Sequence, residues 1–148
     1  MAKFIFKLQG ILNIKEKLEE QEKIAYGNAR IRLTEEEEKL ERLFVKRSDL
    51  VEEKRVQMSS LIKARDLNLT ENAIRATDLS IDDQKKAVKK AQKALEAARL
   101  KLEDAIKERK IYEKLRENAF TEFLAETEHA EQMEINELVS YRHGRAGA

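Results

Sequence analysis

The amino-acid sequence predicts an all-α fold in which two long helices form an antiparallel coiled-coil hairpin. Charged residues make up 40% of the 148 residues, and the chain contains no proline and only four glycines. A composition with so few helix breakers is typical of long helices and coiled coils. We therefore expect a single coiled-coil domain over residues 1–148. It comprises a first helix at about 4–66, a turn at about 67–70, a second helix at about 71–140 and a short flexible C-terminal tail.

Apolar residues in the first half recur every three or four positions, in two stripes shifted by one residue. The shift falls beside Gly27, and glycine costs about 1 kcal/mol relative to alanine inside a helix. Because such register shifts locally change the winding of a coiled coil, we expect a gentle kink or a hinge there. The first stripe holds Phe4, Leu8, Ile11, Leu18, Ala25 and Ala29, and the second holds Leu33, Leu40, Phe44, Val51, Met58 and Leu61.

The turn is expected within the stretch RDLNLTENA, residues 65–73. Asn68 and Thr70 are both suitable N-caps for a second helix, and Glu71 follows Asn68 by three positions. With a turn near residue 68, the numbers of facing residues should sum to about 136. Leu40 would then face Leu95, and Leu33 would face Leu102.

The second half shows a regular heptad pattern from Ile74 onward. Large aliphatic residues lie seven apart, and mostly small residues follow each by three positions, which is the pattern of a coiled-coil seam. A single helix cannot bury such a stripe alone, so the two helices should pair within one chain, which is then monomeric. The aliphatic positions are Ile74, Ile81, Val88, Leu95 and Leu102, and the seam weakens at Arg109 and Arg116 before Phe123.

Apolar residues are most concentrated at the two ends of the expected hairpin. At the open end, the N-terminal apolar residues cover more of the helix circumference than a two-stranded seam can bury, so a further surface should meet them. This candidate partner-binding end comprises Phe4, Phe6, Leu8, Ile11, Leu12, Met133, Ile135 and Leu138, with the first residues expected beside the last. At the tip, Leu67, Leu69 and Leu79 fall outside the expected seam and form a second candidate binding surface.

No pattern of catalytic or metal-ligating residues is present. The chain has no cysteine, and His129 and His143 have no partner at ligand spacing. The four glutamates at 35–38 are expected to spread around a solvated helix face. We therefore expect no catalytic residue, metal or cofactor, and a protein that is not an enzyme.

Charge and hydropathy exclude further classes. The 30 basic and 29 acidic residues are interleaved, which argues against nucleic-acid binding. No apolar run is long enough to span a bilayer, and no signal-peptide cleavage site is visible. These features indicate a cytoplasmic protein.

The two ends of the chain resemble the flagellar export protein FliJ family. The opening FKLQGILNIKEKLEEQ is similar to the Phe-x-Leu, Ile-Leu and Lys-Glu-rich start of that family, and AEQMEINELVSYR is similar to its Glu-rich C-terminal stretch. Asn136 stands where the family pattern has an aspartate, whereas Glu137 is retained.

This resemblance implies a stalk-like component of the flagellar type III export apparatus. Its paired termini would enter the hexameric export ATPase, and it would contact the membrane export gate and export chaperones. It would be cytoplasmic and peripherally associated with the inner membrane at the flagellar base. Two alternatives remain: an export chaperone that escorts other chaperones or unfolded cargo, and a generic coiled-coil spacer or homodimer.

Overall fold

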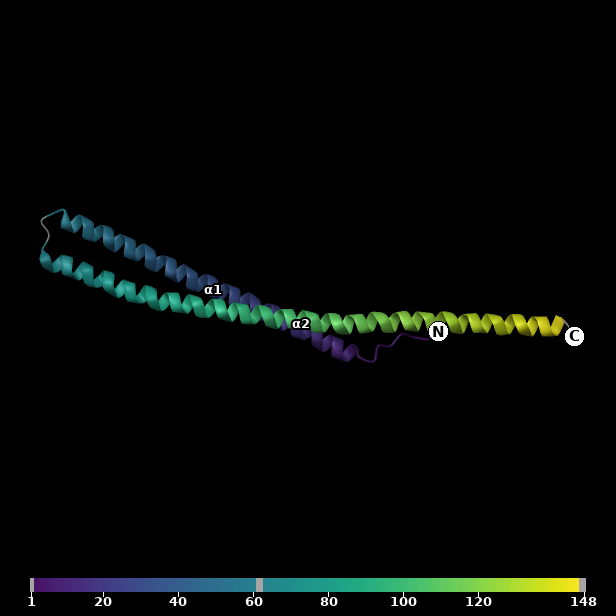
Figure 1. The fold of residues 1–148 in the computed structure, drawn as a ribbon. Coiled ribbons are helices and arrows are strands. Elements are labelled where there is room, and N and C mark those ends of the chain that lie inside the picture. The colour runs from purple at the N-terminus through teal and green to yellow at the C-terminus, as the bar shows by residue number, and fades with distance from the viewer. Residues whose placement is uncertain (1, 61–62, 147–148) are drawn as a thin grey trace. The chain divides into compact units, whose positions relative to one another are not determined.

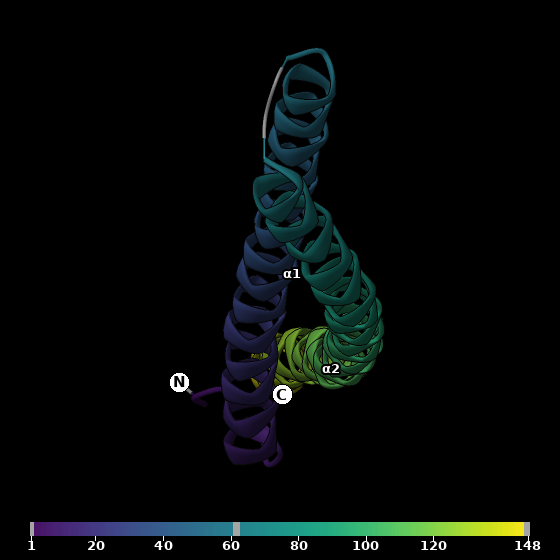
Figure 2. The same ribbon diagram turned by 90° about the vertical axis from the view of Figure 1, so that its left-hand side faces the viewer.

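The chain forms two long helices in a computed structural model that describes residues 2–60 and 63–146. Helix α1 comprises Gln9–Met58 and helix α2 comprises Ala64–Ala146 (Figure 1). The helices are antiparallel, because later residues of α1 pair with earlier residues of α2. Figure 2 shows the pair from the end at which they are joined. The predicted all-α antiparallel hairpin is confirmed.

Both helices pass through two compact units. One comprises Met1–Glu20 and Glu103–Ala148, and we call it the terminal unit. The other, Gln21–Leu102, is called the turn unit because it includes the connection between the helices. No helix within the described residues is both long and apolar enough to cross a bilayer.

The connection between the helices lies earlier than the sequence predicted. Helix α1 ends at Met58, where the hydroxyls of Ser59 and Ser60 both donate to the carbonyl of Val56. Residues 67–70, expected as the turn, are helical. Thr70 does not cap a helix start, because its hydroxyl donates to the Asp66 carbonyl within α2. The part of the expected first helix at residues 61–62, with Leu61, lies outside the described residues.

The earlier connection changes the pairing of the helices. Arg47 pairs with Asp78, and Lys54 pairs with Glu71, so the numbers of these partners sum to 125 rather than 136. The expected register, with Leu40 facing Leu95 and Leu33 facing Leu102, is therefore wrong. A flexible tail was also expected after residue 140. This is wrong for residues up to Ala146, because α2 continues to that residue.

The heptad seam predicted for α2 is confirmed over most of its length. Ile81 and Ala91 are 5% and 6% exposed, and Thr77 is 2% exposed. The other predicted seam residues from Ile74 to Tyr112 are half-buried. Alanine and threonine at these positions leave room for α1, because their short side chains fill little of the space between the two helices.

The two stripes predicted for α1 are right at Ala29, Leu33 and Leu40, which lie on the seam, and wrong elsewhere along the helix. The buried and half-buried residues of α1 follow one heptad pattern without a shift beside Gly27, where the helix is continuous. Several expected seam residues instead face solvent, including Leu18 at 41% and Met58 at 68% exposed. The seam positions are Leu12, Lys15, Glu19, Glu22, Tyr26, Ala29, Leu33, Glu36, Leu40, Leu43, Arg47, Leu50, Lys54 and Gln57. Six of these are charged. A search for regularly spaced apolar residues misses them, although several are held in the seam by polar groups of α2.

Candidate partner-binding surfaces

The segment before α1 is extended rather than helical. Residues 2–6 carry no helix, and α1 is entered through a turn in which the Gln9 N–H donates to the Phe6 carbonyl at 3.1 Å. Side-chain exposure alternates along it: Phe4, Phe6 and Leu8 are half-buried, whereas Ile5 is 75% exposed. A period of two is that of an extended chain lying on a surface. The expected helix start at residue 4 is therefore wrong.

Phe4 attaches this segment to α2 within the terminal unit. Its ring lies 5.1 Å from that of Phe120 in an edge-on arrangement and 5.5 Å from that of Phe123. The guanidinium of Arg116 lies 5.5 Å from the Phe4 ring centroid, and its Nε donates to the Gln9 side chain at 2.9 Å. Aromatic pairs and cation–π contacts of this kind each add stabilisation beyond area burial. Arg116, which interrupts the apolar seam in the sequence, thus has a role in packing.

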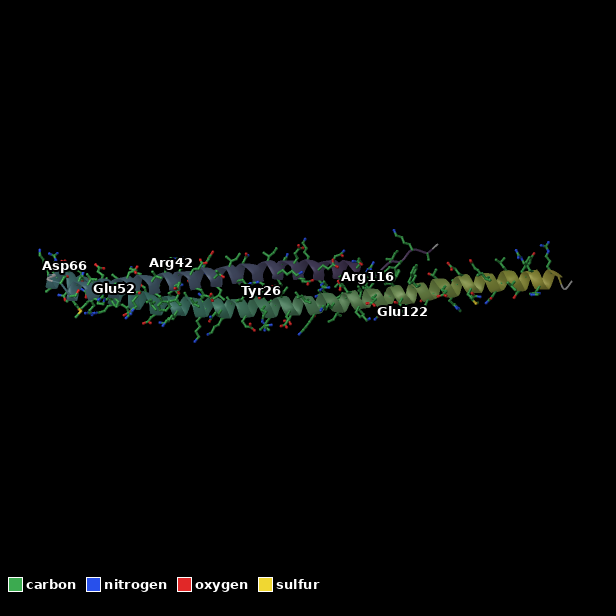
Figure 3. All side chains as sticks on the ribbon, turned by 90° about the horizontal axis from the view of Figure 1, so that it is seen from above. Tyr26, Arg42, Glu52, Asp66, Arg116 and Glu122 are labelled. Atoms are coloured by element: carbon green, nitrogen blue, oxygen red, sulfur yellow. The ribbon has the colours of Figure 1, made fainter. Side chains whose placement is uncertain are left out.

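An open groove of about 720 Å³ lies between the extended segment and α2. It has apolar walls from the segment, and Lys3 and Lys7 lie at its margin together with Glu122 and Glu126 of α2. Figure 3 marks Arg116 and Glu122 on this part of α2. Leu12, one of the expected binding residues, is 3% exposed and belongs to the core of the terminal unit, whereas Ile11 is 38% exposed.

The C-terminal members of the expected binding end do not lie beside Phe4. Because the helices pair in an earlier register, Phe4 contacts Phe120 and Phe123 instead of Met133, Ile135 or Leu138. These three residues are 49%, 53% and 62% exposed. Every described side chain from residue 128 to residue 145 is exposed, and in Figure 3 side chains project both above and below this part of α2.

The seam of the terminal unit contains ion pairs. Arg109 bonds to Glu19 across the helices and to Glu113 on α2 at 2.7 Å. The hydrogen bond to Glu19, and then the bond to Glu113, raise the pKa of Arg109 above its usual range. Lys15 lies 3.5 Å from Glu108. Arg109, one of the two arginines that weaken the seam in the sequence, is therefore matched by opposite charges.

A buried glutamate occupies the seam of the turn unit. Glu36 is 3% exposed and accepts a hydrogen bond from Gln84 Nε2 at 2.5 Å, while Arg32 and Lys39 lie 3.0 and 3.5 Å away. The Gln84 hydrogen bond is the largest cause of a Glu36 pKa below its usual value. The expectation that all four glutamates at 35–38 are solvated is thus wrong for Glu36, whereas its three neighbours are exposed.

The three expected tip residues lie in different environments. Leu67 is half-buried and occupies a seam position of α2, seven residues before Ile74. Leu69 and Leu79 are 58% and 68% exposed and remain available for contact. Val56 and Met58, which the tip hypothesis did not include, are also exposed.

A lysine cluster on α2 was missed from the sequence. Five of the nine residues at 85–93 are lysines, and no acidic residue occurs between Gln84 and Leu95. The nearly equal totals of basic and acidic residues concealed this local imbalance. The cluster comprises Lys85, Lys86, Lys89, Lys90 and Lys93, all exposed, and within the described residues none of them makes an ion pair.

Within the described residues, no three His, Cys, Asp or Glu side chains gather in a way that could hold a metal ion. The grooves on the described surface are open to solvent. The features that distinguish this surface are therefore apolar and charged contact areas.

Comparison with known proteins identifies the family. The model of the flagellar FliJ protein family matches residues 4–148. A solved structure described as a proposed YscO homolog, CT670 from Chlamydia trachomatis, aligns with a TM-score of 0.66 and 22% identity over 97% of this chain and 99% of that one. This second likeness concerns the fold. No curated protein sequence is significantly similar to this chain. The chain belongs to the flagellar FliJ protein family, and its role is in flagellar protein export.

Proposed function

We propose that this protein is a non-enzymatic coupling stalk of flagellar export. In this role its terminal unit inserts into the central opening of the hexameric export ATPase, and its turn unit contacts the membrane export gate. The protein is monomeric when alone, and it works at the cytoplasmic face of the inner membrane. The likeness to a YscO homolog supports the two-helix fold on which this role depends.

One observation carries the proposal: the exposed segment of α2 from residue 128 to residue 145, which has no partner helix among the described residues. An isolated helix of this length is marginal in water, because most helix stability in proteins comes from burying an apolar face. Ile135, Leu138 and Val139 lie on one side of it and are 53%, 62% and 49% exposed. A ring that surrounds the segment would cover these residues from outside.

The contacts of Phe4 support α2 at the start of its exposed segment. The aromatic cluster fixes the N-terminal segment on α2 immediately before the exposed residues begin. The ATPase ring would therefore meet a helix that is supported where its exposed segment begins, rather than a free peptide. Ordering costs on binding are smaller for a pre-organised element.

Truncation tests this proposal. A chain that ends at Thr127 keeps the contacts of Phe4 and should keep its helical circular dichroism per residue, but it should no longer bind the export ATPase in a pull-down. As a control, Leu69→Ser/Leu79→Ser should bind the ATPase normally and lose binding to the gate protein. Full ATPase binding by the truncated chain would refute insertion of this segment.

A second candidate function, escort of export chaperones or unfolded cargo, is favoured by the outer face of α1. Ile24, Ile31 and Val45 are 61%, 59% and 52% exposed, and open grooves of about 520 and 470 Å³ lie around the last two. In this case Ile24→Ser/Ile31→Ser/Val45→Ser should abolish protection of an unfolded export substrate from aggregation. The stalk function predicts no change in that assay.

A further inference from the structure

The lysine cluster of the turn unit lies mainly on the face of α2 that points away from α1. Gln84, Val88 and Ala91 form the seam at this level. With 100° of rotation per residue, Lys86, Lys89, Lys90 and Lys93 fall on the opposite side of the helix and Lys85 at its flank. All five are exposed. Lys85 also lies 5.9 Å from the centroid of the Phe44 ring.

Beside the start of the lysine cluster, the outer face of α1 is acidic. The Gln84–Glu36 hydrogen bonds place residues 35–41 across the seam from the start of the lysine cluster, whereas the rest of the cluster lies opposite residues before Glu36, among them the exposed Arg30 and Arg32. Glu36 points into the seam, whereas Glu35, Glu38 and Glu41 are exposed. The outer side of α2 is therefore positive from Lys85 to Lys93, with Asp82, Asp83 and Glu96 beyond its ends, and the outer side of α1 is negative beside the start of the cluster. A planar anionic surface would orient such a unit with α2 toward it.

We infer that the outer face of α2 between Leu79 and Leu100 binds the surface of a membrane that contains anionic phospholipid. The two leucines are 68% and 48% exposed and lie on the same helix face as the lysines, one on each side of the cluster. Leucines at the interface gain by entering the acyl boundary, and lysines gain by meeting headgroup phosphates. This inference does not depend on binding to the export ATPase.

Other polyanions fit this face less well. A single-stranded nucleic-acid site needs aromatic side chains on which bases stack, and the lysine face has none. Exposed leucines would gain nothing at a phosphate backbone. An acidic peptide is usually held in a groove, and none of the grooves described above is lined by a residue of the cluster. A convex row of lysines instead suits a flat surface.

The expected binding is weak, reversible and salt-dependent. Each lysine close to an anionic leaflet strengthens binding about fivefold. Loss of four lysines should therefore weaken binding by more than about 100-fold. Since exposed charges are screened beyond about 8 Å at physiological ionic strength, binding should fall steeply between low and high salt.

Vesicle sedimentation tests the inference with the full chain. The vesicles are pure phosphatidylcholine, or phosphatidylcholine with about 30% phosphatidylglycerol. The variant is Lys86→Gln/Lys89→Gln/Lys90→Gln/Lys93→Gln. The control, Lys101→Gln/Lys107→Gln/Lys110→Gln/Lys114→Gln, removes the same charge elsewhere on α2.

The unaltered chain and the control should sediment with the anionic vesicles at low salt, and neither should sediment with the neutral ones. The cluster variant should remain in the supernatant, and Leu79→Ser/Leu100→Ser should bind several-fold more weakly than the unaltered chain. Failure of the unaltered chain to bind, or equal loss by both lysine variants, would overturn the inference. A cluster variant that keeps vesicle binding but loses binding to duplex DNA or to an acidic protein would also overturn the inference.

Discussion

The ring of Phe4 packs edge-on against the ring of Phe120, with centroids 5.1 Å apart and ring planes at 71°. This contact fixes an extended segment on α2 at a place where the sequence pattern indicated a continuing helix. It also sets where the paired part of the terminal unit ends and the exposed part of α2 begins.

Replacement of Phe4 by alanine should lower the free energy of unfolding by about 1–3 kcal/mol. The change removes two aromatic contacts and part of the apolar area buried by the ring. Chemical denaturation with circular dichroism measures the effect. Ile5→Ala is the matched control, because Ile5 is 75% exposed and should change stability by less than about 0.5 kcal/mol. Equal effects of the two changes would mean that the segment is not held on α2.

Ile81 and Leu79 provide a test of the seam within one turn of α2. Ile81 is 5% exposed and Leu79 is 68% exposed. Ile81→Ala should destabilise the protein by about 2–4 kcal/mol, since it leaves a cavity between the helices. Leu79→Ala should have an effect below about 0.5 kcal/mol. Thermal unfolding that ranks these variants in the opposite order would contradict the described seam.

The register of the hairpin can be read from cross-linking, because the chain has no native cysteine. Glu36→Cys/Gln84→Cys should form an intramolecular disulfide under mild oxidation, since the Gln84 amide reaches the Glu36 backbone carbonyl at 2.9 Å. Leu40→Cys/Leu95→Cys, which the sequence pattern would pair, should not. Mobility on a non-reducing gel and peptide mapping distinguish the outcomes. Efficient cross-linking of the second pair alone would mean that the turn lies at residues 67–70, as the sequence pattern predicted.

Glu36 should contribute to the pH dependence of stability. Its folded-state pKa is lowered chiefly by the hydrogen bond from Gln84, with smaller effects of Lys39 and Arg32. A lowered folded pKa means that the contribution is fully present above the unfolded value near 4.3 and is lost as pH falls through the folded value. Gln84→Leu should therefore raise the pKa of Glu36 and lower the melting temperature more at pH 7 than at pH 3.

Carboxylate titration by NMR measures the pKa directly in both proteins. Glu37→Gln serves as the control, because Glu37 is exposed and should leave the titration of Glu36 unchanged. An identical Glu36 pKa in the unaltered chain and in Gln84→Leu would show that the amide does not stabilise the ionised carboxylate.

The second helix could be predicted from sequence because its seam is aliphatic and regular. From Ile74 to Leu102 five large aliphatic residues recur at one heptad position, and hydrophobic burial decides their side of the helix. The first helix could not be read in the same way. Glu36 and Arg47 occupy seam positions because of polar partners on α2. A pattern based on hydrophobicity found Leu33 and Leu40 but missed these polar seam residues.

The candidate binding end was predicted in part. The apolar residues near both termini were identified, but a turn placed about seven residues too late put Phe4 beside Met133 instead of Phe120. In an antiparallel hairpin, an error in the turn shifts every facing pair by twice that amount. The signal that could have corrected it was the serine pair at 59–60, whose hydroxyls bond to a terminal carbonyl of α1.

The central claim is that the exposed C-terminal segment of α2 enters the ring of the export ATPase. The most direct measurement is the affinity of the ATPase hexamer for Ile135→Ser/Leu138→Ser, compared with Ile24→Ser/Ile31→Ser, which removes two similarly exposed isoleucines from α1. A few large apolar anchors commonly carry most of the energy of an interface. The account predicts at least a 10-fold loss of affinity and loss of ATPase stimulation for the first variant alone, with both variants folded. Unchanged affinity and stimulation for Ile135→Ser/Leu138→Ser would contradict it.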